Sequence, residues 1–348
     1  MSETHTPARG AATLHDVARE AGVSLATASR VLNGSTRKVA DSYRERVDAA
    51  AQKLGYTANL SAQATARGTS AIVALLVADI GDVSFGRLAS GVVRGAEEAG
   101  FIVTIADTGR DPERELRLVR TLRGQRPRGL ILGVARNAGS DSAALQGELT
   151  ALAAMGCHVV VLGEGEPAHR SISLGNRGGA EALGAELAEL GYRDAVVVGG
   201  PEGLRASDDR IGGFTAGFTA GGGRIGAVRH GATTRDAGYA AAGELLADGL
   251  AEGTLIFGVS DLVAAGVASA LRDAGRRVGA EIAVAGFDDI PTCRDIGPGL
   301  TTVRAPFDAL GYRALRAAVE SDWRGDAEAP LALEVVVRGS TPRRDGDG

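Results

Sequence analysis

The sequence contains little of what metal sites, disulfide frameworks and membrane spans require. It has two cysteines, Cys157 and Cys293, which stand far apart and outside any Cys-x-x-Cys pair, so buried thiols are expected rather than a zinc cluster or a disulfide framework. The longest apolar run, residues 71–78, is far too short to span a bilayer. The first residues lack the apolar segment of a secretory signal peptide. We therefore expect a cytoplasmic protein with no metal, no cofactor and no membrane partner.

The motifs of several enzyme classes are missing as well. A phosphate-binding P-loop needs a lysine after its second glycine, yet the only two lysines, Lys38 and Lys53, do not follow a glycine. No G-x-S-x-G nucleophile turn and no H-E-x-x-H metal motif occurs. The five histidines are scattered, and roles in strands or at the surface explain them more readily than acid-base or metal chemistry. We expect no catalytic residues.

Composition and charge indicate a folded protein with two unlike parts. The chain has 348 residues, of which 44% are hydrophobic and 23% charged, values that are ordinary for globular proteins and leave room for two or three units. Residues 1–70 carry nine basic and six acidic side chains, a net charge of +3, whereas the remainder carries −8. This asymmetry suits a head that meets phosphates, although so small a positive charge also arises by chance.

Residues 13–33 predict two short helices joined by a tight turn. Apolar residues at helical spacing form the inner face of the first helix: Leu14, Val17, Ala18 and Ala21. Gly22 provides the turn, and Ser24 is a suitable N-cap for the second helix. In that helix Ala28, Val31 and Leu32 are expected to face inward, and Leu25, Ala26, Ser29 and Arg30 outward. A third helix is expected over 41–54. The pattern favours a helix-turn-helix whose second helix enters the DNA major groove, with plain packing helices as the alternative.

From residue 71 onward, short β-branched runs alternate with helical stretches. Strands are predicted over 71–80, 101–108, 129–134, 158–164, 195–200, 225–231, 254–260 and 281–288. Helices are predicted between and around them, including 85–99, 112–122, 143–155 and 307–319. Repeated strand-helix units imply parallel sheets with helices on both faces, and this many strands favours two lobes.

The run LHDVAREAGVSLATASRVLNG, followed by VDAAAQKLGYTAN, resembles the lactose and purine repressor family (LacI/GalR). Similarity to the effector domain of that family continues through DRIGGF, VSDLVAAGVASALRDAGRRV, VAGFDDIP, PGLTTVR and LEVVVRGST. The resemblance covers about residues 13–341. It implies an α + α/β architecture with a three-helix head, a hinge helix and a two-lobed effector domain like that of periplasmic binding proteins.

The resemblance also implies domain limits. They are a helix-turn-helix head over 1–57, a hinge helix and linker over 58–70, and an effector and dimerisation domain over 71–341. Lobe 1 is expected over about 71–173 and 304–328, and lobe 2 over about 174–303 and 329–341. The chain is expected to cross between the lobes near Ser173, Val303 and Glu328.

In the second helix, Arg30 is expected to read a guanine through O6 and N7, and Leu25 and Ala26 to make apolar contacts such as with a thymine methyl group. Hydroxyl and amide groups suit phosphate contacts, namely Ser24, Thr27, Ser29 and Asn33. The resemblance further places Asn59, Ala62 and Thr65 in a hinge helix against the minor groove. Thr65 stands where the family usually has a leucine wedge, so a strong central kink is not expected. An ordinary linker is the alternative.

Ligands of open α/β sheets bind beyond the carboxyl ends of the strands. Asp82 and Phe85 follow the first predicted strand there, and Ser260 follows a later one. By resemblance, Arg210 and Asp288 are candidate polar clamps on an effector, because a guanidinium fork and two carboxylate oxygens suit vicinal sugar hydroxyls. A surface ion pair and a turn are the alternatives for these two residues.

Two departures from the family pattern bear on the predicted effector site. Thr233 stands where the family often has an aromatic platform, and Gly175 where an aspartate is usual, so a smaller, differently shaped or more polar ligand is expected. Asp261 and Asp289 are expected to be structural, as helix caps rather than ligand contacts.

The sequence thus predicts a ligand-responsive transcriptional repressor that binds a near-palindromic operator in double-stranded DNA as a homodimer, with a carbohydrate or a derivative as effector. A dimer is expected because the end of the chain has no leucine heptads. The alternative is a cytosolic sugar- or nucleoside-binding protein whose N-terminal helices merely pack. An enzyme is a distant third.

Overall fold

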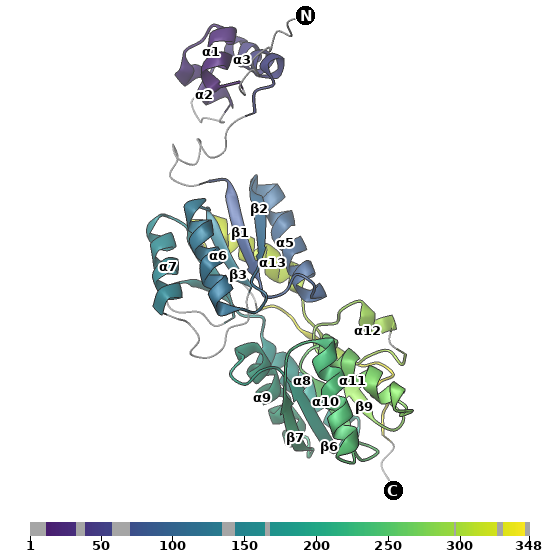
Figure 1. Ribbon diagram of the computed structural model, residues 1–348. Helices are drawn as coiled ribbons and strands as arrows, with labels where there is room; N and C mark the ends of the chain where they lie inside the picture. Colours follow the sequence, from purple (N-terminus) through teal and green to yellow (C-terminus); the bar gives the residue numbers. More distant parts are fainter. Residues whose placement is uncertain are drawn as a thin grey trace, which may run out of the picture. The chain divides into compact units, whose positions relative to one another are not determined.

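The computed structural model describes residues 12–32, 39–57, 70–133, 143–163, 168–295, 297–325 and 330–344. By its internal contacts the chain divides into two compact units, Met1–Ser70 and Ala71–Gly348 (Figure 1).

The first unit contains three described helices, α1 (Leu14–Ala21), α2 (Leu25–Leu32) and α3 (Asp41–Leu54). Thr13 caps α1, since its side chain accepts from the backbone N–H of Asp16 and the Asp16 carboxylate accepts in return from the backbone N–H of Thr13. The predicted turn is confirmed at Gly22, which has a left-handed φ of 65°. The predicted cap of α2 is confirmed as well, because Ser24 Oγ accepts from the N–H of Thr27 at 3.1 Å.

The core of the first unit is small. Val17, Ala28 and Val47 are fully buried at its centre, one from each helix. Alanines supply the rest of the buried core: Ala18, Ala21, Ala50 and Ala51. Because alanine fills little volume, the three helices pack closely around few large side chains.

The second unit opens with lobe 1, a parallel sheet in the order β2-β1-β3-β4-β5. Its strands are β1 (Ile72–Val77), β2 (Ile102–Asp107), β3 (Gly129–Gly133), β4 (His158–Leu162) and β5 (Arg170–Ile172), and its helices are α5 (Val83–Ala99), α6 (Pro112–Gly124) and α7 (Ala143–Ala154). All residues of β3 and nearly all of β1 are buried. Burial on both faces explains why these strands are continuous apolar runs.

Lobe 2 repeats the plan with four parallel strands in the order β7-β6-β8-β9. Its strands are β6 (Asp194–Gly199), β7 (Arg224–His230), β8 (Leu255–Gly258) and β9 (Ala283–Ala285), and its helices are α8 (Asn176–Glu189), α9 (Arg205–Ala220), α10 (Arg235–Ala247), α11 (Asp261–Asp273) and the short α12 (Thr292–Asp295). All eight strands expected from the sequence are present, which confirms two parallel sheets.

Two later strands, β10 (Thr302–Arg304) and β11 (Glu334–Val336), pair antiparallel outside both sheets. Between them α13 (Phe307–Val319) returns to lobe 1, as predicted, and packs along α5. The two helices approach closely at Gly311, where an added Cβ would lie 2.1 Å from the carbonyl oxygen of Leu88. Any larger residue there would push α13 off α5.

Two expectations about strands need correction. Strand β5 was not expected, because its Arg-Ser-Ile sequence is no apolar run; its pairing with β4, Val160 opposite Arg170, makes it a strand. Several strands were also predicted to be longer than they are, because their apolar sequence continues into the loops beyond the paired residues. Of the predicted crossings, Val303 lies in β10 and Ser173 directly follows β5, while Glu328 lies outside the described residues.

Candidate functional site

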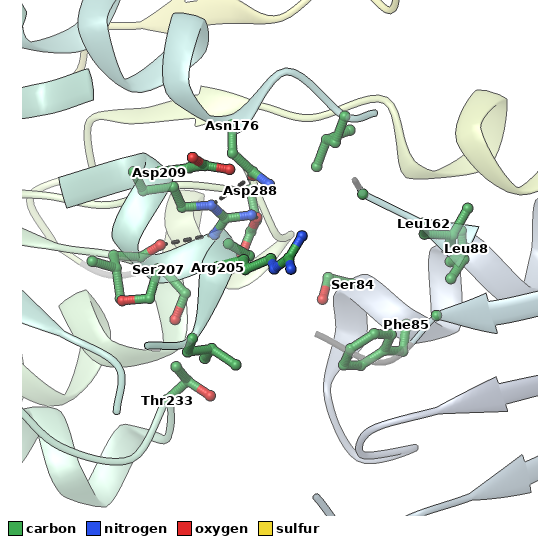
Figure 2. Close-up of a pocket in the computed structure, with 18 of the residues that line it drawn as sticks. Ser84, Phe85, Leu88, Leu162, Asn176, Arg205, Ser207, Asp209, Thr233 and Asp288 are labelled. Atoms are coloured by element: carbon green, nitrogen blue, oxygen red, sulfur yellow. Dashed lines mark hydrogen bonds and ion pairs between the residues drawn. The ribbon is translucent and has the colours of Figure 1, made fainter. Parts of the chain in front are cut away.

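A cavity of about 280 Å³ lies between the two lobes, at the carboxyl ends of their strands. All six residues predicted to bind an effector line it: Asp82, Phe85, Arg210, Thr233, Ser260 and Asp288. Figure 2 shows Asp288, Thr233 and their neighbours on one side of this cavity and Phe85 on the other. Segments more than 200 residues apart in the sequence therefore meet at one site.

Arg210 is held in place by three polar partners and by an aromatic ring. Its Nε donates to Asn176 Oδ1 at 2.9 Å, and its Nη1 donates to the carbonyl oxygen of Val259 at 2.8 Å. Its Nη2 lies 3.0 Å from Asp288 Oδ1, and the guanidinium stacks 3.9 Å above the ring centroid of Phe287. The residue is only 9% exposed. Arg210 is therefore a preorganised, largely buried donor and not a surface ion pair.

Asp288 lies at a strained position between the cavity and the crossing strands. Its φ is 119°, a value that non-glycine residues rarely adopt, and Asp289 follows with a φ of 51°. Burial raises the pKa of the Asp288 carboxyl to about 7, with the carboxylates of Asp261 and Asp82 adding to the rise and Arg210 opposing it. Asp288 forms a β-bridge with Arg304 of the crossing strands, and its contact with an effector stays a prediction.

The remaining predicted cavity residues include two helix caps. The Asp82 side chain accepts from the N–H of Ser84 at 2.9 Å and begins α5, and the Ser260 side chain accepts from the N–H of Val263 at 3.4 Å and begins α11. Both nevertheless line the cavity, as does Thr233 in the loop before α10. Effector contact by these side chains stays a prediction.

The expectation that Asp261 and Asp289 cap helices is wrong. Ser260 is the cap of α11, and the fully buried Asp261 instead accepts from the N–H of Ile290 at 2.9 Å and from Thr302 Oγ1 at 2.6 Å. Asp289 accepts from Arg304 Nε at 2.8 Å and from Arg338 Nη2 at 2.6 Å. Both carboxylates therefore fix the crossing strands to lobe 2, because the tertiary fold brings those strands to them.

Sequence reasoning did not single out several cavity residues. Arg205 and Ser207 follow β6, so the rule for carboxyl-end loops could have indicated them. Asn176 starts α8 directly after Gly175, whose φ of 82° is costly for a side chain such as aspartate. No local signal marks Phe307 and Leu310, which reach the cavity only because α13 returns to lobe 1.

On the head, the second helix exposes the side chains predicted to contact DNA. Leu25 is 39% exposed, Ala26 and Arg30 are also exposed, and Thr27 and Ser29 are half-buried. Ser24 and Thr27 hydrogen-bond to each other through their hydroxyls at 2.8 Å. Asn33, Asn59, Ala62 and Thr65, and with them the predicted hinge helix, lie outside the described residues.

Both cysteines are free and buried, as expected. Burial raises the pKa of the Cys157 thiol to about 12, which makes it unreactive at neutral pH. Within the described ranges no cluster of three metal-ligating side chains occurs. No helix among those residues is long and apolar enough to cross a membrane.

Both units of the chain match known protein families. Residues 13–59 match the family described as bacterial regulatory proteins, lacI family, and residues 185–341 match the periplasmic binding protein-like domain. The chain is 30% identical over 338 residues to the HTH-type transcriptional regulator DegA of Bacillus subtilis, covering 94% of this chain and 98% of DegA. It is 33% identical over 317 residues to GalS of Salmonella typhimurium, covering 88% of this chain and 89% of GalS.

Solved structures agree with these matches. The lac repressor dimer bound to operator and the anti-inducer ONPF superposes with a TM-score of 0.82 at 25% identity, covering 96% of this chain and all of that chain. The complex of the transcriptional regulator CelR with cellobiose superposes with a TM-score of 0.66 at 28% identity, covering 94% and 99%. The resemblance seen in the sequence is confirmed, and the chain belongs to the LacI/GalR family of helix-turn-helix transcriptional regulators.

Proposed function

We propose that this regulator is a repressor that binds a near-palindromic operator as a homodimer. Its affinity for the operator falls or rises when a carbohydrate or a derivative binds in the cavity between the lobes. One observation carries the effector half of the proposal: a largely buried arginine and a buried aspartate, 3.0 Å apart, line a cavity between two lobes. Because a DNA-binding regulator has to reach the DNA, we propose a cytoplasmic location. We propose no catalytic step.

The proposed DNA contacts follow from the exposed face of α2. Arg30 can donate two parallel hydrogen bonds to guanine O6 and N7, which no other base pair accepts in the same way. Leu25 and Ala26 are exposed at the start of the helix and suit the thymine methyl group. The hydroxyls of Ser24, Thr27 and Ser29 suit phosphate oxygens, which fix the register of the helix on the duplex.

The proposed coupling uses the two lobes. A ligand held by Arg210 on lobe 2 and by side chains of lobe 1 favours one angle between the lobes, and that angle changes the relative position of the segments that lead to the two heads. The ligand shifts operator affinity only by its differential affinity for the two arrangements. We keep head, hinge and effector limits of 1–57, 58–70 and 71–341 as part of this proposal.

The DNA half is tested with duplexes from the region that flanks the gene. The full chain should shift a duplex containing a near-palindrome, and a chain lacking residues 1–68 should not. Equal binding to scrambled duplexes, or a monomer in sedimentation at the concentrations used, would contradict operator recognition by a dimer.

The effector half is tested by a thermal-shift screen of sugars, sugar phosphates, nucleosides and purines, because a ligand that binds the native state raises the melting temperature by mass action. Arg210→Ala should abolish the shift produced by any compound found. Arg224→Ala is the matched control, since that arginine pairs with Asp194 at the surface with its side chain 81% exposed. An unchanged dose response of Arg210→Ala would remove Arg210 from the site.

A further inference from the structure

The carboxyl end of α13 is held by three basic side chains of lobe 1. Three successive carbonyl groups of the helix each accept a hydrogen bond from one of them: Ala317 O from Arg170 Nη1, Ala318 O from His158 Nδ1 at 3.1 Å, and Val319 O from Arg128 Nη2 at 3.0 Å. The last carbonyl groups of a helix have no partner within the helix, and positive charge is favourable beside them. We call Arg128, His158 and Arg170 the basic clamp.

The basic clamp and the inter-lobe cavity lie at opposite ends of α13. At the start of the helix, Phe307 and Leu310 line the cavity at the carboxyl ends of the strands. At its end, the clamp residues stand at the amino ends of the strands, since Arg128 directly precedes β3 and His158 and Arg170 are the first residues of β4 and β5. Thirteen helical residues span about 20 Å. The helix therefore connects the cavity with the opposite edge of the lobe 1 sheet.

Close backbone contacts at both ends of α13 leave the helix little room to bend. Near the cavity, an added Cβ at Gly91 of α5 would lie 2.0 Å from the carbonyl oxygen of Asp308. Near the clamp, an added Cβ at Gly129 of β3 would lie 2.6 Å from the carbonyl oxygen of Ala318. Densely packed interiors transmit strain rather than absorb it. A displacement of the first turn of α13 is therefore expected to reach its last turn.

Arg128 joins the end of α13 to the place where the chain enters lobe 1. Its side chain holds the last turn of the helix, and Nη2 also donates to Ser321 Oγ at 3.1 Å. Its backbone N–H donates to the carbonyl oxygen of Ile72 at 2.8 Å. Ile72 is the first residue of β1, the strand that follows the head and the linker along the chain. One residue thus contacts both the helix that lines the cavity and the first strand after the head.

We propose that Arg128 is a positioning residue that couples the inter-lobe cavity to the head. A ligand that displaces Phe307 and Leu310 moves α13, and Arg128 transfers this movement to Ile72 and so to the start of β1. Loss of the Arg128 side chain leaves both binding surfaces intact but weakens the link between them. The inference rests on the proposed function, in which filling the cavity changes operator affinity through two arrangements of the protein.

A double-mutant cycle on the full chain tests the link without a ligand. Leu310→Ala removes a side chain that is 3% exposed at the cavity end of α13, and it should change the affinity for an operator duplex by about fivefold or more. In the Arg128→Met background the same substitution should change the affinity by less than about twofold, because methionine keeps an unbranched apolar stem without the donors. Thermal unfolding shows that each variant is folded.

Two further backgrounds separate coupling from a general loss of stability. Arg128→Lys keeps a cation and a donor at the end of α13, so it should restore part of the effect of Leu310→Ala. Arg276→Met is the matched control, because Arg276 is a partly buried arginine of lobe 2, with its side chain 29% exposed, and pairs with Glu252 and Glu281. In that background the effect of Leu310→Ala should keep its full size. A reduction as large as in Arg128→Met would contradict a specific role of Arg128.

Hydrogen exchange over residues 70–76, measured without DNA, distinguishes failure of the link from failure of the proposed function. Leu310→Ala should speed exchange there in the wild-type background and leave it nearly unchanged in Arg128→Met. A chain that shows this pattern but binds no operator would reject the proposed regulator and leave the link standing. Equal effects of Leu310→Ala in both backgrounds, on exchange or on operator affinity, would overturn the proposal, as would the absence of any effect of Leu310→Ala.

Discussion

The two proposed binding surfaces use arginine in opposite ways. Arg30 on the head is exposed on a helix surface, where it can reach toward a base, whereas Arg210 in the cavity is 9% exposed and held by three groups of its own protein. The first side chain has to be ordered when it binds, and the second is ordered already. Removal of Arg30 therefore affects binding alone, while changes around Arg210 also affect the stability of the fold.

The cores behind the two surfaces differ as well. Seven buried residues, most of them alanine, form the core in the described part of the head, whereas each lobe has a sheet buried on both faces. Small domains bury a smaller fraction of their surface and are closer to unfolding. The head should accordingly respond to conservative core changes that the lobes would tolerate.

The largest effect is expected for Asp289→Ala. This carboxylate, with its side chain 4% exposed, binds Arg304 and Arg338, and its removal leaves both arginines without that partner. We expect the free energy of unfolding of the two-lobed unit to fall by about 3–5 kcal/mol, measured by chemical denaturation. Asp236→Ala, whose side chain is 94% exposed, is the control and should change the free energy little. A loss of stability in Asp236→Ala as large as in Asp289→Ala would show that the ion pairs of Asp289 do not hold the crossing strands.

Asp288 gives the stability of the two-lobed unit a pH dependence. Its pKa of about 7 in the fold lies above the ordinary value of 3.8, so between these two pH values only the unfolded chain releases the proton. The free energy of unfolding of wild type minus that of Asp288→Asn should therefore decrease as the pH rises from 3.8 to about 7, by at most about 4 kcal/mol. Unfolding of both proteins at several pH values checks this sign. A difference that grows with pH would refute it.

Val47→Ala probes the small core of the head. Val47 is fully buried in α3 and contacts a core made mostly of alanines, so loss of two methyl groups should destabilise the head by roughly 2 kcal/mol. Hydrogen exchange in the full chain should show faster exchange over α1 to α3 and unchanged exchange in the two lobes. Unchanged protection of the head would mean that this core is less critical than its size suggests.

Arg30→Ala tests the exposed surface. Operator binding should weaken by about 1–3 kcal/mol, and specificity should relax at one base pair, because a bidentate contact with guanine is lost. Binding to operators with each base pair substituted measures both effects. Arg44→Ala, another exposed arginine on α3, should leave the base preference unchanged. Full affinity and an unchanged preference in Arg30→Ala would exclude it as the reader of that base pair.

The smallest effects concern helix caps in the head. Thr13→Ala removes the capping box of α1 and should cost about 1 kcal/mol of head stability. Ala40→Ser should act in the opposite direction by a similar amount, because Ala40 precedes α3 and makes no side-chain cap. Thermal unfolding of the two variants beside wild type gives both shifts, and shifts of the same sign would contradict the assignment of these caps.

Much of the fold was predictable because its signals are local. The apolar stripe and caps of α1 and α2, and the β-branched runs of the buried strands, depend on residues a few positions apart, so periodicity and capping identify them. Strand β5 was not predicted, because Arg170 and Ser171 have no strand signal of their own. They form a strand only because they pair with β4. Asp261 and Asp289 were misassigned because their partners lie 15 to 49 residues away.

The sequence also predicted part of the lining of the candidate cavity. Five of its six predicted residues lie in loops or first helical turns that follow strands, so the rule for carboxyl-end loops, together with the resemblance, placed them in one region. The sixth, Arg210, lies inside α9, and the resemblance alone indicated it. Phe307 and Leu310 reach the cavity through the return of α13 to lobe 1, and no local pattern encodes that return.

The sequence alone determined the family, the helix-turn-helix, the parallel sheets and the residue types available to the cavity, because these follow from nearby residues and from long matching motifs. Only the tertiary structure decided that Arg210 and Asp288 are buried together, that the pKa of Asp288 rises, and that Phe307 and Leu310 of α13 reach the same cavity. Burial, charge proximity and the division of a surface between two lobes depend on which distant segments meet, and that is a property of the folded chain.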